Sequence, residues 1–504
     1  MATGTQAQTL REVLDYGAGD HAALVAPDGP SITYDDLRAQ VDRLRVQLRE
    51  LGIGKDDRVA IVLPNGLESI VTFLTVTAAA TAAPLNAAYK IDEFAFYLDD
   101  TNASAVITGP EGGEAIVEVA PAGALHIVAT MDDAGQVNFA AAGGGDGASA
   151  SDSPWPATDD VALVLHTSGT TSRPKRVPLT HRNLTTSLRN IAATYDLTEE
   201  DVALCVMPLF HVHGLVASTL STLQTGGTVV APPRFNPLNF WPVVKEHSVT
   251  WYSAVPTMHQ ALLARARSTK PEVPETLRFI RSCSAALPPV VMDELEQQFR
   301  VPVLEAYGMT EAAHQMASNP LPPGNRLPGA VGPGTGVEVA IMDEEGTLLI
   351  AGERGEVVIR GENVISGYEN NPEANATSFT NGWFRTGDEG MLDGEGYLTL
   401  TGRLKEMINR SGEKISPLEI DNALLDHPAV AEAVAFGVAH QTHGEEASAA
   451  VVLNGEVTPQ ELVAFCRTKL ADYKCPRVIH VMEEIPRGPT GKIQRRFLTE
   501  MFSK

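Results

Sequence analysis

Apolar residues recur at helical spacing near the start of the chain. Between Tyr34 and Leu51 they follow one another at alternating steps of four and three, at Leu37, Val41, Leu44, Leu48 and Leu51. This spacing predicts an amphipathic helix, which Gly52 and Gly54 end. The short apolar run from Arg58 to Leu63 predicts a buried strand, and the alanine-rich segment after Pro64-Asn65-Gly66 predicts a second helix.

Strand, turn and helix alternate in this way as far as Val128, which predicts an α/β layered fold with a largely parallel sheet. The Gly-, Ala- and Ser-rich stretch from Ala141 to Asp152 predicts a surface loop. After Gly402 charged residues become frequent and the apolar runs are short. We therefore predict a large amino-terminal α/β domain with an associated β region over residues 1–402, and a small, mobile carboxy-terminal α+β domain over residues 403–504.

Composition excludes several classes of protein. The 504 residues include 38 Lys and Arg against 63 Asp and Glu, a formal net charge of −25, which disfavours nucleic acid as a partner. The longest apolar stretch, Ile70 to Leu85, contains four threonines and is too short for a membrane span. The amino terminus lacks a secretory pattern, and the four cysteines show no metal spacing, so we expect buried thiols in a cytoplasmic protein.

The segment from Leu165 to Lys175 is the sharpest local signal for chemistry. It contains Thr167, Ser168, Gly169, Thr170, Thr171 and Lys175. Backbone amides and hydroxyls on one loop can surround an anion, and a lysine adds a point charge. The Gly-Lys-Ser/Thr ending of a Walker loop is absent from the segment. Alone, the segment could equally be a solvated turn.

Four further motifs follow in order: Tyr307-Gly308-Met309-Thr310-Glu311, Gly382-Trp383-Phe384-Arg385-Thr386-Gly387-Asp388, Gly402-Arg403-Leu404-Lys405-Glu406 and Pro489-Thr490-Gly491-Lys492. The series resembles the acyl-adenylate-forming superfamily of acyl-CoA synthetases, luciferases and peptide-synthetase adenylation domains. The resemblance implies a ligase in which a carboxylate attacks the α-phosphate of ATP, giving acyl-AMP and pyrophosphate, and a thiol such as that of CoA then displaces AMP.

The resemblance also implies roles for individual residues. Lys492 is the leading catalytic cation for adenylation, with Thr310 at the α-phosphate, Glu311 as the Mg²⁺ ligand and Lys405 as the hinge of the small domain. Asp388 and Arg403 would bind ribose or phosphate, and the adenine wall would comprise Ser284, Ala285, Ala286 and Tyr307. Gly412 and Lys414 would face CoA. Any one of these residues alone could be an ordinary cap or surface charge, so the inference depends on the ordered set.

The phosphate loop departs from the superfamily pattern at two positions, where Ser172 and Arg176 replace the usual glycines. If the backbone at Arg176 needs a positive φ, the loop geometry or ATP affinity would suffer. Alternatively, the extra guanidinium assists pyrophosphate binding.

The acid substrate is suggested by polar residues where fatty-acid and aromatic-acid enzymes would carry small or apolar ones. These residues are His211, His213, Ser284 and His314. Imidazoles and a hydroxyl favour a second anionic group on the acid, and the combination resembles the oxalate-activating members of the superfamily. Oxalate is the preferred hypothesis. Malonate or another short acid, a stand-alone adenylation enzyme that loads a carrier protein, and a nucleotide-binding regulatory protein stay open. We expect a monomer or homodimer whose other partners are small molecules.

Overall fold

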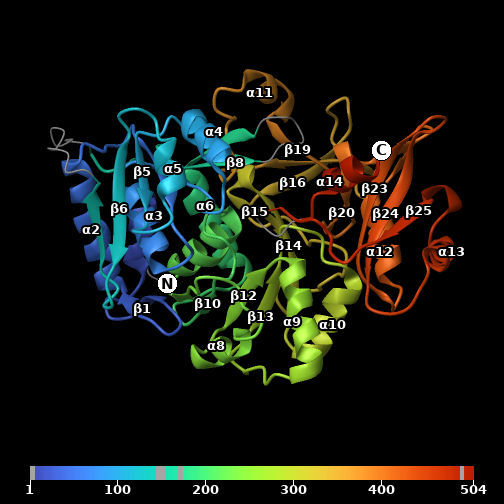
Figure 1. Cartoon of the computed structure of the whole chain (residues 1–504), viewed down its shortest axis with the longest axis horizontal. Helices are drawn as coiled ribbons and strands as arrows, with labels where there is room; N and C mark the ends of the chain where they lie inside the picture. The colour runs from blue at the N-terminus through green and yellow to red at the C-terminus, as the bar shows by residue number, and fades with distance from the viewer. Residues whose placement is uncertain (1–5, 143–153, 168–173, 489–492, 504) are drawn as a thin grey trace.

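The computed structural model describes residues 6–142, 154–167, 174–488 and 493–503. Within these residues the strands form four β-sheets. The chain runs from the blue amino-terminal layers on the left of Figure 1 to a red lobe on the right, which holds the last sheet and its helices. The predicted α/β layers, associated β region and carboxy-terminal α+β part are all present in this arrangement.

The first sheet has seven strands. In spatial order they are β7 (Val137–Ala141), β6 (Leu125–Met131), β5 (Ala105–Thr108), β3 (Arg58–Val62), β4 (Thr81–Pro84), β8 (Val161–Thr167) and β9 (Lys175–Thr180). The pairs inside the sheet are parallel, and the two edge pairs are antiparallel. The predicted first helix is α2 (Tyr34–Glu50), which begins where the Thr33 hydroxyl caps the Asp36 amide. The predicted strand and second helix are β3 and α3 (Leu67–Ala79).

The second sheet has eight strands. In spatial order they are β15 (His314–Ser318), β14 (Val303–Met309), β13 (Phe279–Ser282), β12 (Trp251–Ala254), β10 (Val202–Leu204), β11 (Thr228–Val230), β1 (Ala22–Val25) and β2 (Ser31–Thr33). Strands β12, β13 and β14 are parallel, so their carboxyl ends meet at one edge, where α/β folds commonly bind ligands.

Helices cover these sheets. They include α4 (Ile91–Thr101), α6 (His181–Thr194), α8 (Phe240–Glu246), α9 (Pro256–Thr269) and α10 (Pro289–Phe299). In Figure 1, α8 lies below β12 and β13, and α9 and α10 lie to their right. One apolar core spans the first sheet, α2, α3 and α6, and a second lies under the helices of the second sheet.

The third sheet is antiparallel and supplies the β region. Its strands are β16 (Glu338–Met342), β17 (Arg354–Arg360), β18 (Phe379–Thr380), β19 (Trp383–Leu392) and β20 (Leu398–Arg403). Asp388 of β19 pairs in register with Arg403 of β20. The predicted domain boundary at residues 402/403 therefore falls at the end of β20, and it stays a prediction.

The fourth sheet is built from the remainder of the chain. It contains β21 (Ile408–Arg410), β22 (Glu413–Ile415), β23 (Val430–His440), β24 (Gly444–Leu453) and β25 (Val478–Val481), with helices α12 (Pro417–Leu425), α13 (Pro459–Lys469) and α14 (Arg495–Phe502). Two of the short apolar runs of this region, residues 433–438 and 449–453, lie in β23 and β24. Apolar side chains on both faces of this sheet form separate small cores.

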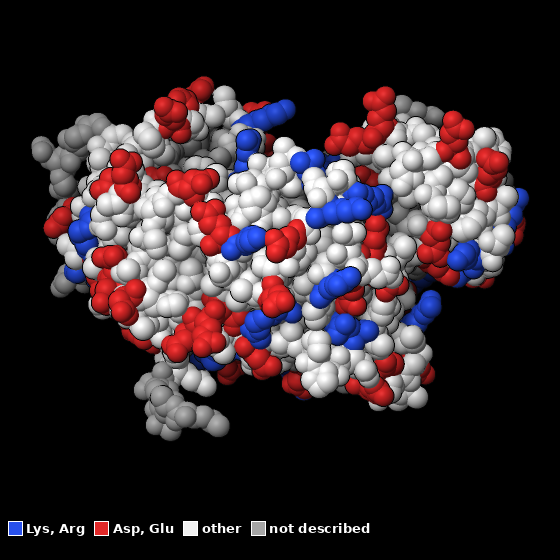
Figure 2. Space-filling model, turned by 90° about the horizontal axis from the view of Figure 1, so that it is seen from below, with Lys and Arg blue, Asp and Glu red and all other residues white. Residues whose placement is uncertain are grey.

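Surface features agree with the composition. Acidic side chains are spread across the face shown in Figure 2, with basic side chains among them mainly in the central and right-hand parts. No helix in the described ranges is both long and apolar enough to cross a bilayer. All four cysteines are free and buried, as predicted. Most of the predicted surface loop, residues 143–152, lies outside the described residues.

Glu305 in β14 is a carboxyl group buried within the second sheet, 3% exposed. Its Oε1 accepts a hydrogen bond from the Leu287 amide at 2.8 Å. Burial raises the pKa of Glu305 to about 8. Since the folded-state pKa lies above the unfolded value, Glu305 contributes stability that is fully present below the unfolded pKa of 4.5 and is lost as the pH rises toward 8.

The variant Glu305→Gln, which keeps the shape without the charge, should therefore gain stability relative to the wild type as the pH rises from 5 to 8. One pKa unit corresponds to about 1.4 kcal/mol, so the difference should grow by about that amount per pH unit. Denaturant unfolding of both proteins at several pH values measures it. The exposed Glu373→Gln variant in α11 (Pro372–Ser378) should follow the wild type. If the unfolding free energies of Glu305→Gln and the wild type instead changed in parallel with pH, the neutral state of the buried carboxyl would be contradicted.

Candidate active site

The structure brings together three predicted nucleotide residues from three strands. The Tyr307 hydroxyl in β14 donates to Asp388 Oδ2 in β19. Asp388 Oδ1 lies 3.3 Å from Arg403 Nε in β20. Burial and the neighbouring Asp388 carboxylate raise the pKa of Tyr307, and attraction to Asp388 raises the pKa of Arg403. The motifs containing Tyr307, Asp388 and Arg403 are thus parts of one polar site.

A second group lies beside it, around η3 (Thr310–Ala312). Glu311 is 5% exposed, and its Oε1 accepts a hydrogen bond from the Tyr368 hydroxyl at 2.8 Å. Lys175 Nζ lies 4.3 Å from the centre of the Tyr368 ring, as in a cation–π contact. Burial lowers the pKa of Lys175, while Glu311 opposes that shift. The phosphate-loop lysine and the Thr-Glu motif therefore share one electrostatic environment.

Glu311 was predicted to hold Mg²⁺, and its surroundings fit that ion. Burial raises the pKa of Glu311, so its ionised form is costly in the protein alone. A hard cation takes carboxylate oxygens, and its charge would compensate the buried anion. When bound there, Mg²⁺ would supply positive charge to the phosphates of ATP. Thr310, the first residue of η3, is half-buried beside it.

Part of the predicted site cannot be placed. Ser168, Gly169, Thr170, Thr171, Ser172 and Lys492 lie outside the described residues. Thr167, the last residue of β8, is opposite Lys175 of β9 in the antiparallel register. Strand β8 therefore ends beside the start of β9.

The predicted acid-binding residues come together at the carboxyl edge of the second sheet. His213 begins the π-helix η2 (His213–Leu220), a rare helix type that often occurs at functional sites. Its Nδ1 lies 2.9 Å from Ser284 Oγ. The His213 and His314 rings meet edge to face, with centroids 5.3 Å apart. The exposed fractions of His213 and His314 are 0% and 2%. His211 is half-buried in the preceding turn, where its Nδ1 accepts the His213 amide.

Two of these residues have unusual backbone conformations. Ser284 has φ of 74° and His314 has φ of 108°, both in the region that favours glycine. Such conformations cost about 1–3 kcal/mol each and cluster at functional sites. Gly308 lies close to His314 in the hairpin, and a Cβ there would collide with the His314 backbone and ring. The glycine of the Tyr-Gly-Met-Thr-Glu motif thus makes room for His314.

The predicted adenine wall is divided. Ser284, Ala285 and Ala286 follow β13, and the two alanines are exposed. Ser284 contacts His213 and so also borders the acid-binding group. Tyr307 is buried against Asp388. The segment after β13 therefore borders both parts of the site.

The residues predicted to act in the thioester step lie in or before the right-hand lobe of Figure 1. Lys405 is exposed in the short helix η4 (Leu404–Glu406) between β20 and β21. Gly412 adopts φ of 90° in the turn between β21 and β22. Lys414 Nζ lies 3.6 Å from Glu344 Oε1 of the larger part, so this face of the lobe is turned toward Glu344.

Sequence analysis missed three residues that support the site. Tyr368 orients Glu311. Arg281 in β13 and Ser253 in β12 form a buried hydrogen bond, and Ser253 Oγ lies 2.6 Å from His213 Nε2. The available signal was the arginine itself, because Arg281 directly follows the apolar pair Phe279-Ile280 in a strand whose four residues are all buried.

Arg176 does not have the strained backbone considered from the sequence, and it is a buried ion-pair partner. It lies in β9 without a positive φ, and only 7% of it is exposed. Its guanidinium donates to the Asp100 carbonyl, and its Nε lies 3.2 Å from Glu369 Oε2. Arg58 also pairs with Glu369, at 2.8 Å. In this structure Arg176 is an ion-pair partner of Asp100 and Glu369.

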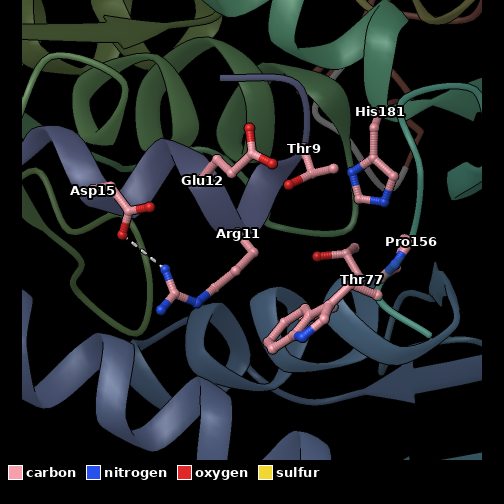
Figure 3. Close-up of a pocket in the computed structure, with 9 residues that line it drawn as sticks. Thr9, Arg11, Glu12, Asp15, Thr77, Pro156 and His181 are labelled. Atoms are coloured by element: carbon pink, nitrogen blue, oxygen red, sulfur yellow. Dashed lines mark hydrogen bonds and ion pairs between the residues drawn. The ribbon is translucent and has the colours of Figure 1, made fainter. Parts of the chain in front are cut away.

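A cavity of about 180 Å³ lies elsewhere, between the amino-terminal segment and α3 (Figure 3). It is lined by Thr9, Arg11, Glu12, Asp15, Thr77, Ala78, Trp155, Pro156 and His181. Arg11 is paired with Asp15 and Asp42, and His181 Nδ1 accepts the Leu10 amide at 3.1 Å. Burial lowers the pKa of His181 to about 4. These internal contacts are typical of structural packing, and the cavity contains none of the predicted site residues.

The fold and the site define the class of this protein. Residues 13–369 match the AMP-binding enzyme family, and residues 419–492 match the AMP-binding enzyme C-terminal domain. The chain belongs to the AMP-binding enzyme family, and the predicted superfamily is confirmed.

Individual relatives cover nearly the full chain. The oxalate–CoA ligase of Arabidopsis thaliana is 48% identical over 495 residues, which cover 96% of each protein. The oxalate–CoA ligase of Saccharomyces cerevisiae is 44% identical over 525 residues, covering 97% of this chain and 96% of the relative. The solved structure of ATP-bound MatB from Rhodopseudomonas palustris matches with a TM-score of 0.89 at 29% identity, covering 98% of this chain and 99% of MatB.

Replacement of Arg176 distinguishes an ion-pair role from a phosphate-binding role. Arg176→Met should lower the free energy of unfolding by about 2 kcal/mol, because Asp100 and Glu369 lose a buried donor. The KM for ATP should change less than about threefold. Lys175→Met should do the reverse, with weaker use of ATP and little change in stability. Thermal unfolding and pyrophosphate release measure the two effects. Unchanged stability of Arg176→Met with a large rise in the KM for ATP would contradict the ion-pair role.

Proposed function

We propose that this protein is an AMP-forming acid–CoA ligase that converts oxalate, ATP and CoA into oxalyl-CoA, AMP and pyrophosphate. The observation that carries the proposal is its 48% identity to an oxalate–CoA ligase over 96% of both chains. The buried cluster of His213, Ser284 and His314 supports the same substrate, because it offers polar groups to an acid with a second carboxylate.

The reaction needs two half-steps. A free carboxylate is a poor acyl donor, since its leaving group would be oxide. Attack of one oxalate oxygen on the α-phosphate breaks the bond to pyrophosphate and gives oxalyl-AMP. Attack by the CoA thiol on the acyl carbon then breaks the bond to AMP, with loss of the thiol proton. In the first half-step charge accumulates at the phosphates, so aimed cations and donors supply the catalysis.

We assign the nucleotide side to the residues that the structure groups together. Asp388 would accept hydrogen bonds from the ribose hydroxyls, with Tyr307 and Arg403 holding its carboxylate in place. Lys175 would attract the phosphates, and Thr310 would donate to the α-phosphate. Glu311, held by Tyr368, would be the carboxylate for Mg²⁺. The role of Lys492 as the adenylating cation rests on the sequence resemblance.

We further propose that residues 403–504 form a mobile domain that rotates about Lys405 between the half-steps. Exposed Lys405 lies in the short connection between β20 and β21, where a rotation axis between the two parts would pass. Rotation would withdraw Lys492 and present Gly412 to the pantetheine arm of CoA. The buried free thiols support the proposed cytoplasmic location, where thiols stay reduced.

A panel of acids tests the substrate assignment. CoA-dependent AMP formation should be at least about tenfold more efficient with oxalate than with malonate, acetate, octanoate or coumarate, because a pocket of buried polar groups discriminates against acids that leave them unpaired. Omitting CoA, or offering a carrier protein in its place, separates a CoA ligase from a carrier-loading adenylation enzyme. Preference for octanoate or coumarate would exclude the polar acid pocket, and preference for malonate would favour the alternative short acid.

The half-reactions test Lys492 separately. Lys492→Ala should lower adenylation about 100-fold, the usual effect of removing one donor to developing charge. Thioester formation from supplied oxalyl-AMP should stay within about threefold of the wild type, since Lys492 withdraws before that step. Lys469→Ala in α13, where the lysine pairs with Asp426, is the matched control and should change neither rate. Equal loss of both half-reactions would remove Lys492 from its assigned role.

A further inference from the structure

Arg281 is a guanidinium buried at the carboxyl end of β13 and 0% exposed. Its three nitrogens donate to neutral side chains: Nε to the Tyr195 hydroxyl at 2.8 Å, Nη1 to Ser253 Oγ at 2.8 Å and Nη2 to Gln315 Oε1 at 2.9 Å. Among the residues that the structure describes, no carboxylate forms an ion pair with it. An uncompensated buried charge is costly, so an anionic ligand nearby would be favoured.

The chemistry of arginine fixes the direction of the neighbouring hydrogen bonds. A guanidinium only donates, so Ser253 Oγ accepts from Arg281, and the same oxygen lies 2.6 Å from His213 Nε2. Arg281 Nη1 also faces that nitrogen, at 3.5 Å. A hydrogen on Nε2 would point at the guanidinium, which has no acceptor, so the Ser253 hydroxyl donates to Nε2. His213 Nε2 is therefore the acceptor, and the neutral ring carries its hydrogen on Nδ1.

The tautomer of His213 also fixes the direction of its hydrogen bond with Ser284. His213 Nδ1 lies 2.9 Å from Ser284 Oγ, so the ring donates and the serine oxygen accepts. The hydroxyl hydrogen of Ser284 then points away from the ring. Arg281 also donates to Gln315, which is next to His314 in β15. Arg281 therefore contacts the strands on both sides of the proposed acid pocket.

We propose that Arg281 is a positioning residue for the acid: acting through Ser253, it holds His213 as the Nδ1–H tautomer and turns the Ser284 hydroxyl to donate to the second carboxylate of the substrate. The inference rests on the proposed function and adds the origin of its selectivity for a dianion. Arg281 itself does not touch the acid. The side chains of Ser253 and His213 separate its positive charge from the pocket. This nearby charge favours a second negative charge on the substrate.

Ser253→Ala is the decisive variant, because it interrupts the series of hydrogen bonds and leaves Arg281 in place. The KM for oxalate should rise at least about tenfold, because one directed hydrogen bond is lost. The KM for ATP should stay within about twofold. Ser253→Thr, which keeps the hydroxyl, should restore oxalate use. Ser221→Ala in α7 (Ser221–Leu223) removes an equally buried hydroxyl, bonded to the Ala217 carbonyl, and should leave both constants unchanged.

The tautomer gives a readout that does not need activity. With ¹⁵N-labelled histidine, the His213 ring of the ligand-free wild type should carry its hydrogen on Nδ1, and Ser253→Ala should lose that preference. An Nε2–H ring in the wild type, or unchanged oxalate KM in Ser253→Ala, would overturn the inference while the ligase activity of the wild type still supports the proposed function. Absence of oxalate-dependent AMP formation by the wild type would instead overturn the proposed function.

Discussion

The antiparallel pairing of β14 with β15 is the constraint on which the site depends. In this hairpin Met309 lies opposite His314, and Gly308 lies opposite Gln315. The strand entering the hairpin presents Tyr307 to the nucleotide side, its turn carries Glu311, and the strand leaving it presents His314 to the acid side. If one strand slipped by one residue, all of its side chains would turn to the other face of the sheet. The register of the β14–β15 hairpin therefore sets the distance between the proposed nucleotide and acid sites.

The two sides of the site carry different kinds of charge. On the nucleotide side, buried Asp388 and Glu311 face the cations Arg403 and Lys175. The acid side is built from neutral donors in front of a buried guanidinium. ATP with its metal ion is complementary to the first arrangement, and a small dianion is complementary to the second. The two arrangements thus suit the two anionic substrates of the proposed function.

The carboxy-terminal lobe is joined to the larger part by polar contacts near the connecting helix η4. Ser416 donates to the Thr401 carbonyl, and Lys414 pairs with Glu344. Both partners of the second contact are largely exposed, and exposed ion pairs contribute at most about 1 kcal/mol. The apolar cores of the lobe lie within its own sheet and helices. Apolar cores that lie within the lobe are compatible with the proposed rotation of residues 403–504 as one unit.

The order of hydrophobic periods and motifs, which is local information, determined the α/β layers, the helix at Tyr34–Glu50, the family and the types of residue needed for ATP and a polar acid. Tertiary structure alone decided which long-range partners those residues have. Arg176 pairs with Glu369, and Arg281 reaches His213 through Ser253, because strand order brings together side chains that are far apart in the sequence. Neither partnership leaves a periodic signal, since burial and hydrogen-bond direction depend on neighbours from other strands rather than on adjacent residues.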